Sequence, residues 1–66
     1  MATFENSSHV KEATWEGGIL LVTFKGGERY EYYDVPSSIL QEWLAAPSAG
    51  KFLNAEIKSQ FESAKV

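Results

Sequence analysis

The segment ILLVTFKGGERYEYYDVP, residues 19–36, contains two strand patterns that a short glycine turn separates. Side chains alternate along an extended chain, so every second residue projects to the same side. In the first pattern this places three apolar side chains together: Leu20, Val22 and Phe24. In the second it places two tyrosines together: Tyr30 and Tyr32. The Lys-Gly-Gly-Glu step between them is typical of a turn, because glycine adopts positive φ without strain. The segment therefore predicts a β-hairpin.

A further strand pattern precedes the hairpin, over residues 9–15. Simple alternation places Val10, Glu12 and Thr14 on one side, with Lys11, Ala13 and Trp15 on the other. Valine, threonine and tryptophan all favour strands. Gly17-Gly18 then supplies a second turn. Three strands joined by two short turns predict an antiparallel meander.

Two helices are predicted after the meander. Pro36 ends the sheet and fits the first turn of a helix. That helix runs to about Ala46, with an apolar stripe at helical spacing: Ile39, Leu40, Trp43 and Leu44. Pro47 stops it, and Ser48 is the expected N-cap of a last helix. The last helix carries apolar residues spaced by four: Leu53, Ile57 and Phe61.

These elements predict an α+β fold. It is a three-stranded antiparallel β-meander followed by two α-helices packed on one face, in the order β-β-β-α-α. We expect residues 1–8 to form a polar N-terminal arm and residues 9–66 to form a single domain.

The composition limits what such a small domain can use. A chain of 66 residues buries only roughly 60% of the surface that its unfolded form exposes. Two Trp, three Tyr and four Phe supply a dense core, and burial in a homo-oligomer is the expected second source of stability. The chain has no cysteine and one histidine, so we expect no disulfide, no metal site and no cofactor.

The charge and hydropathy of the chain also exclude some classes of protein. Six basic residues stand against nine acidic ones, for a net charge of −3, whereas general nucleic-acid binders need a basic face. The longest apolar run, residues 19–22, has four residues. A membrane span needs about 20 apolar residues, and a signal peptide an apolar core of about 7–15. We expect a soluble, cytoplasmic protein with no membrane partner.

Catalytic chemistry has little support in the residues. His9 is the only side chain whose ordinary pKa lies near pH 7, and it has no neighbours of a catalytic motif. The chain has no P-loop or Rossmann glycine motif. We therefore expect no catalytic residue and no enzyme.

The tyrosine segment, residues 30–33, is the first candidate binding feature. It places aromatic rings on both sides of one strand. A face left exposed would stack bases or pack against a partner, whereas a face under the helices would simply be core. We select Tyr30 and Tyr32 as candidate ligand-binding residues, with the adjacent Arg29 as a cation.

The Ser-Ala-Gly-Lys step, residues 48–51, is the second candidate. A helix start offers unpaired amides and a partial positive charge to an anion. Ser48 can donate to a phosphate, Gly50 keeps the backbone accessible and Lys51 adds a charge. The same residues can equally be an ordinary N-cap with a surface lysine.

Two segments, VTFKGGERYEYYDVP and WLAAPSAGKFLNAEIKSQF, together resemble the KTSC domain family. The resemblance covers roughly residues 8–61 and has its positions in order: Tyr30, Tyr32, Val35, Pro36, Ser48, Gly50, Phe52 and Ile57. Phe61 stands where the family commonly has tyrosine. The family is named for a domain at the C-terminus of some lysyl-tRNA synthetases, and it also occurs as a stand-alone protein of bacteria and phages. The synthetase context implies RNA binding.

Three functions remain as hypotheses. The first is a non-catalytic module that binds a small phosphate-bearing ligand, a nucleotide or a cyclic oligonucleotide signal, and sequesters it between subunits of a homo-oligomer. The second is an RNA- or tRNA-associated accessory module, which predicts a basic patch: Lys25, Arg29, Lys51 and Lys58. The third is a protein–protein adaptor that uses the tyrosine face.

Overall fold

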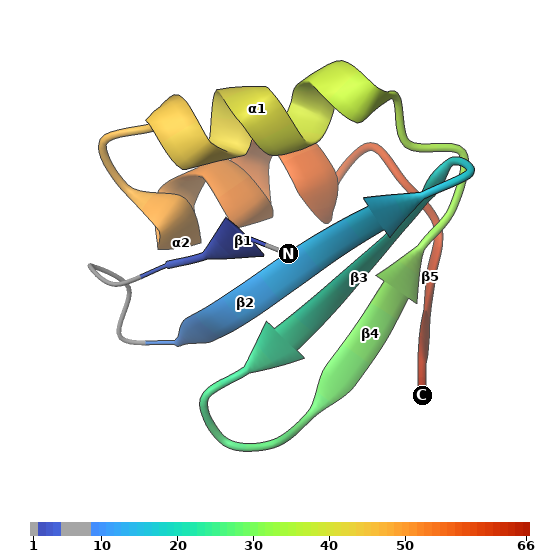
Figure 1. Ribbon diagram of the computed structural model, residues 1–66, viewed down its shortest axis with the longest axis horizontal. Coiled ribbons are helices and arrows are strands. Elements are labelled where there is room, and N and C mark those ends of the chain that lie inside the picture. Colours follow the sequence, from blue (N-terminus) through green and yellow to red (C-terminus); the bar gives the residue numbers. More distant parts are fainter. Residues whose placement is uncertain (1, 5–8) are drawn as a thin grey trace.

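An antiparallel sheet carries the helices on one face (Figure 1). The computed structural model describes residues 2–4 and 9–66. Within these ranges the sheet has five strands in the order β1-β2-β3-β4-β5. Their bounds are Ala2–Thr3, Val10–Glu16, Ile19–Phe24, Arg29–Tyr32 and Ser63–Lys65. The predicted α+β class is confirmed, with its meander as β2, β3 and β4, and two short strands extend the sheet at its edges.

The helices follow the meander as the sequence predicts, but the last one is shorter and partly irregular. The first helix, α1, spans Ser37–Ala45, and Ala49–Phe52 forms α2. A π-helical turn, η1, continues α2 over Leu53–Ile57, and the Lys58 N–H donates to the carbonyl of Leu53, five residues back. The helical spacing of Phe61 predicted a longer helix. That prediction is wrong, because the chain turns after Ile57 and returns to pair as β5.

The pattern predicted for β2 is also wrong at its start. Val10 lies opposite Phe24 and Glu12 opposite Thr23, so Lys11 is an extra residue in the strand. Such a β-bulge shifts the alternation by one residue. Val10 and Ala13 are therefore both buried beneath the helices, although simple alternation placed them on opposite sides.

Side chains of the sheet and the helices meet in one core between the two layers. Its buried members come from nearly every element: Phe4, Val10, Ala13, Leu20, Val22, Tyr32, Val35, Trp43, Leu53 and Ile57. Trp43 is the largest fully buried side chain. Its indole N–H donates to the carbonyl oxygen of Ala49 at 3.0 Å, which joins α1 to α2.

Part of the predicted N-terminal arm belongs to this packed unit. Ala2 and Thr3 pair with Ala13 and Glu12 of β2. Phe4 is only 7% exposed, and its ring centroid lies 4.4 Å from that of Trp43. Residue 1 and residues 5–8 lie outside the described residues.

Candidate functional site

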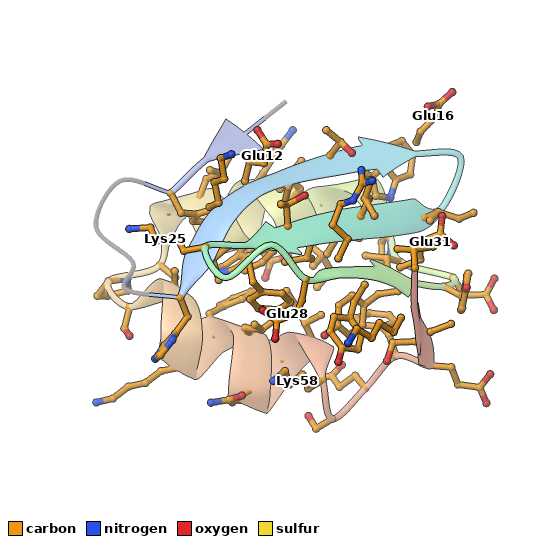
Figure 2. All side chains as sticks on the ribbon, turned by 90° about the horizontal axis from the view of Figure 1, so that it is seen from below. Glu12, Glu16, Lys25, Glu28, Glu31 and Lys58 are labelled. Carbon is orange, nitrogen blue, oxygen red and sulfur yellow. The ribbon has the colours of Figure 1, made fainter. Side chains whose placement is uncertain are left out.

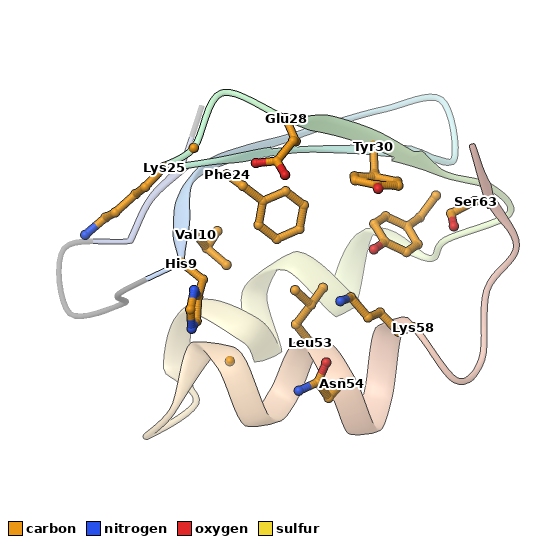
Figure 3. A pocket seen from close by; sticks show the side chains of 13 residues that line it. His9, Val10, Phe24, Lys25, Glu28, Tyr30, Leu53, Asn54, Lys58 and Ser63 are labelled. Carbon is orange, nitrogen blue, oxygen red and sulfur yellow. The ribbon is translucent and has the colours of Figure 1, made fainter. Parts of the chain in front are cut away.

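A cavity lies between the helix-facing side of the sheet and the α2–η1 segment (Figure 3). Its volume is about 770 Å³, which falls within the range of roughly 300–1,000 Å³ for small-molecule sites. The lining combines aromatic, charged and amide side chains: His9, Val10, Phe24, Lys25, Gly26, Glu28, Tyr30, Tyr32, Gly50, Leu53, Asn54, Lys58 and Ser63.

Two aromatic rings form the sheet side of the cavity. Phe24 ends β3, and Tyr30 lies on β4, paired with Val22 two residues before Phe24. Alternation brings both rings to the face that the helices cover. They meet edge to face, with centroids 5.8 Å apart and an angle of 84° between the planes, which is a favourable arrangement for two aromatic rings.

The helix side of the cavity presents residues spaced by four: Gly50, Asn54 and Lys58. Residues four apart lie close together on one side of a helix. Lys58 follows the π-helical turn, and its Nζ lies over the Phe24 ring, 6.0 Å from the centroid. The cavity therefore has a cation on its helix side and an aromatic pair on its sheet side.

The β3–β4 turn closes one end of the cavity. The N–H of Phe24 donates to the carbonyl of Glu28, and the N–H of Gly27 donates to the carbonyl of Phe24. The N–H of Lys25 donates to the carbonyl of His9 at 2.7 Å, which ties the turn to the start of β2. These bonds fix the backbone of the turn. The Glu28 side chain is exposed and lies on the helix-facing side of the sheet, whereas Glu12 and Glu16 lie on the other side (Figure 2).

The structure brings some of the predicted site residues together and separates the others. Tyr30, Tyr32 and Gly50 all line the cavity. Arg29 is exposed and alternates with Tyr30, so it belongs to the opposite face of the sheet. Ser48 caps α2, where its Oγ accepts a hydrogen bond from the Lys51 N–H at 3.4 Å. Lys51 is exposed and lies outside the cavity lining.

The sequence reasoning selected two other residues of the cavity, Lys25 and Lys58, only for the RNA-binding patch of the second hypothesis. Phe24 was treated as core and Glu28 as a charge on the surface. Two signals in the sequence could have assigned Phe24 and Lys58 to the cavity. Phe24 lies one step along the hairpin from Tyr30 on the same face, and Lys58 follows Gly50 at twice the spacing of four.

Tyr32 lies at the base of the cavity with only 2% of its surface exposed. Burial, and to a smaller extent the neighbouring Tyr30, raises the pKa of Tyr32 above its usual value of 10.0. The unfolded phenol then ionises before the folded one as the pH rises. Its contribution to stability is therefore complete below about pH 10 and is lost as the pH rises through the raised pKa.

We accordingly expect the Tyr32→Phe variant to lose less stability than the wild type between about pH 9 and pH 11.5. Urea denaturation at several pH values in this window measures, for each protein, the slope of the free energy of unfolding against pH. The difference between the slopes isolates Tyr32, because the lysines titrate in both proteins. Parallel slopes would contradict the raised pKa.

Two further properties concern only the part of the chain that the structure describes. None of its helices has the length and apolar character needed to cross a bilayer. No group of three or more His, Cys, Asp or Glu side chains there could hold a metal ion.

Comparison with known proteins shows the family and the fold. The family model of the KTSC domain matches residues 6–61. The chain belongs to the KTSC domain family. The match contains every residue that lines the cavity except Ser63. The predicted resemblance is thus confirmed.

Two individual proteins are similar to this KTSC domain. A protein of Tsukamurella paurometabola is 42% identical over 45 residues, which cover 68% of this chain and 67% of that protein. The crystal structure of a KTSC domain protein from Yersinia pestis superposes with a TM-score of 0.84 at 26% identity. That match covers all of this chain and 96% of the other.

Proposed function

We propose that this KTSC domain is a non-catalytic binding module that sequesters a small phosphate-bearing ligand, a nucleotide or a cyclic oligonucleotide. The observation that carries the proposal is the cavity in which Lys58 lies over the Phe24 ring beside Tyr30. A nucleotide combines a flat aromatic base with an anionic group, and this cavity offers a surface for each.

The aromatic pair supports binding of the base. Base–aromatic stacking contributes about 1–3 kcal/mol per base. Phe24 is half-buried and packs against the Tyr30 ring, so little side-chain freedom is lost when a ligand packs against it. Tyr32 and Leu53 extend the apolar lining beneath.

The distribution of charge favours a small ligand over a long RNA. Of the four cations expected in an RNA-binding patch, Lys25 and Lys58 line the cavity. Arg29 lies on the opposite face of the sheet and Lys51 outside the lining. A long polyanion needs several cations along one continuous surface, whereas a single phosphate group needs only a local one.

The adaptor hypothesis required an exposed tyrosine face. Tyr30 and Tyr32 instead face the helices, where Tyr32 is buried. Tyr33 alternates with Tyr32 and is only half-buried, so the adaptor hypothesis stays a prediction that rests on a smaller aromatic surface.

The cavity is lined by residues of one chain and is partly open to solvent. A single subunit therefore offers the binding surface, and a second subunit of the expected homo-oligomer would cover the open side. The homo-oligomer stays a prediction, as does the cytoplasmic location. Native mass spectrometry of the purified protein measures the subunit number and any bound mass together.

We expect Lys58→Met to weaken nucleotide binding about 10- to 100-fold, because a charge-assisted contact is worth about 1.5–3 kcal/mol. The unbranched apolar side chain of methionine is close in length to that of lysine and keeps most of the packing near Phe24. Lys51→Met is the matched control, since it removes the same charge from the same helical segment outside the cavity, and its affinity should stay near that of the wild type. Isothermal titration with mono-, di- and cyclic nucleotides measures both variants.

Three results would contradict the proposal. If no nucleotide in the panel binds, the ligand class is wrong. If Lys51→Met weakens binding and Lys58→Met does not, the helix start is the phosphate site. If only long RNA binds, with an affinity that falls steeply with salt, the accessory-module hypothesis is the better one.

A further inference from the structure

One acidic side chain of the cavity is not explained by binding of a phosphate. Glu28 extends from the β3–β4 turn into the cavity beside the Phe24 ring (Figure 3). A carboxylate there repels an anionic group and attracts a part of a ligand that carries hydrogen-bond donors. Lys58 approaches the same ring from the helix side. The Glu28 carboxylate and the Lys58 ammonium thus reach the Phe24 ring from different walls of the cavity.

Gly26 leaves the space that the Glu28 carboxylate occupies. A Cβ atom built on Gly26 would lie 2.6 Å from Oε1 of Glu28, well inside contact distance. Gly26 does not have a positive φ, so a side chain there would not meet the strain of the left-handed region. The missing side chain at position 26 therefore affects where the Glu28 carboxylate can lie, and not the conformation of the turn.

We propose that Glu28 makes this site selective for guanine bases, an inference that rests on the proposed nucleotide binding. A carboxylate accepts two parallel hydrogen bonds from a group with adjacent N–H donors. Guanine presents two such donors side by side, at N1 and at the 2-amino group. Adenine has one amino group next to the acceptor N1, which faces a carboxylate unfavourably, and hypoxanthine keeps the N1–H but lacks the 2-amino group.

The separation of the charges also sets the orientation of the ligand. A guanine base that packs on Phe24 displaces the Lys58 ammonium from its place over the ring. With the donor edge of the base toward Glu28, the phosphate then points away from the acid and toward the displaced ammonium. The reverse orientation would bring phosphate and carboxylate together and leave the ammonium without a partner. Glu28 is thus a specificity-determining residue and Lys58 supplies affinity for any nucleotide.

The test compares 5′-GMP with 5′-IMP, which differ only by the 2-amino group, in isothermal titrations of the intact protein. We expect the wild type to bind GMP about 10-fold or more tightly than IMP, since a bidentate pair contributes about 1–3 kcal/mol of discrimination. In Glu28→Gln the ratio should fall below about 3, with the affinity for IMP changed less than the affinity for GMP.

Two further variants separate this role from a structural one. Gly26→Ala keeps the charge of Glu28 but forces its carboxylate to move, and the added methyl group meets only the flexible end of that side chain. It should therefore fold normally by circular dichroism and still lose the preference for GMP. Lys58→Met should weaken GMP and IMP equally and leave their ratio unchanged.

The outcomes distinguish this inference from the function on which it rests. If the wild type binds both nucleotides equally, Glu28 is not selective and the nucleotide-binding proposal stands. If Glu28→Gln weakens both nucleotides by the same factor, the inference also fails. If neither nucleotide binds to the wild type, both proposals are overturned.

Discussion

Trp43→Ala is expected to cost about 3–5 kcal/mol of the free energy of unfolding, the usual range for removal of a large buried aromatic side chain. Trp43 is 1% exposed. It projects from α1 into the core, where it contacts α2 through Ala49 and the N-terminal segment through Phe4. The substitution leaves a cavity and removes the hydrogen bond to the carbonyl of Ala49. A domain of this length has a total stability of only roughly 3–10 kcal/mol. The variant should therefore be mostly or entirely unfolded.

Circular dichroism during thermal and urea denaturation measures this loss. Leu44→Ala is the matched control, because Leu44 is the next residue of the same helix and is 49% exposed. It should change the stability by less than about 1 kcal/mol. Trp43→Phe keeps much of the apolar volume and gives a measurable transition if the alanine variant does not fold. A Trp43→Ala protein as stable as the Leu44→Ala protein would contradict the core that the structure assigns.

Phe4→Ala is expected to cost about 3 kcal/mol, although Phe4 lies in the segment that the sequence predicted as a polar arm. Its ring packs on Trp43 at 4.4 Å, and its N–H donates to the carbonyl of Lys11 at 3.1 Å. The ring covers one side of the central tryptophan. Its loss therefore exposes the core to water at the sheet edge that β1 forms.

Phe4→Leu tests whether burial or the aromatic contact matters more, and it should lose less than half as much stability. Because Phe4 and Trp43 touch, their effects should not add, and the double variant should lose less than the sum of the single losses. If Phe4→Ala denatures at the same urea concentration as the wild type, the N-terminal segment does not contribute to the folded domain. The boundary expected at residue 8 would then be correct.

The local patterns in the sequence were sufficient for most of the secondary structure. Two Gly-Gly turns and period-two alternation predicted β3 and β4, since these strands have regular registers. Pro36 and the apolar spacing predicted α1. The β2 pattern failed at Lys11, because a bulge depends on how the partner strand pairs and leaves no clear mark in the strand itself. The edge strands β1 and β5 are two and three residues long, too short for a periodic signal.

The candidate site was predictable only in part. Tyr30 and Tyr32 were recognised as a same-face pair, but which face of β4 the helices cover depends on the whole packing arrangement. The Ser48–Lys51 segment was recognised as a helix start, which it is. The anion-binding role predicted for this segment stays a prediction, and only Gly50 of the segment reaches the cavity lining.

By itself the sequence determined the family, through the order of its motif positions. It also determined the α+β class, the meander and the position of the helices, because these follow from patterns among residues close in the chain. The tertiary structure alone placed Phe24, Glu28 and Lys58 around one cavity and Phe4 on Trp43. Those positions arise when the sheet and the helices pack together, and they join residues that are up to 39 positions apart. Neither periodicity nor turn chemistry contains that information.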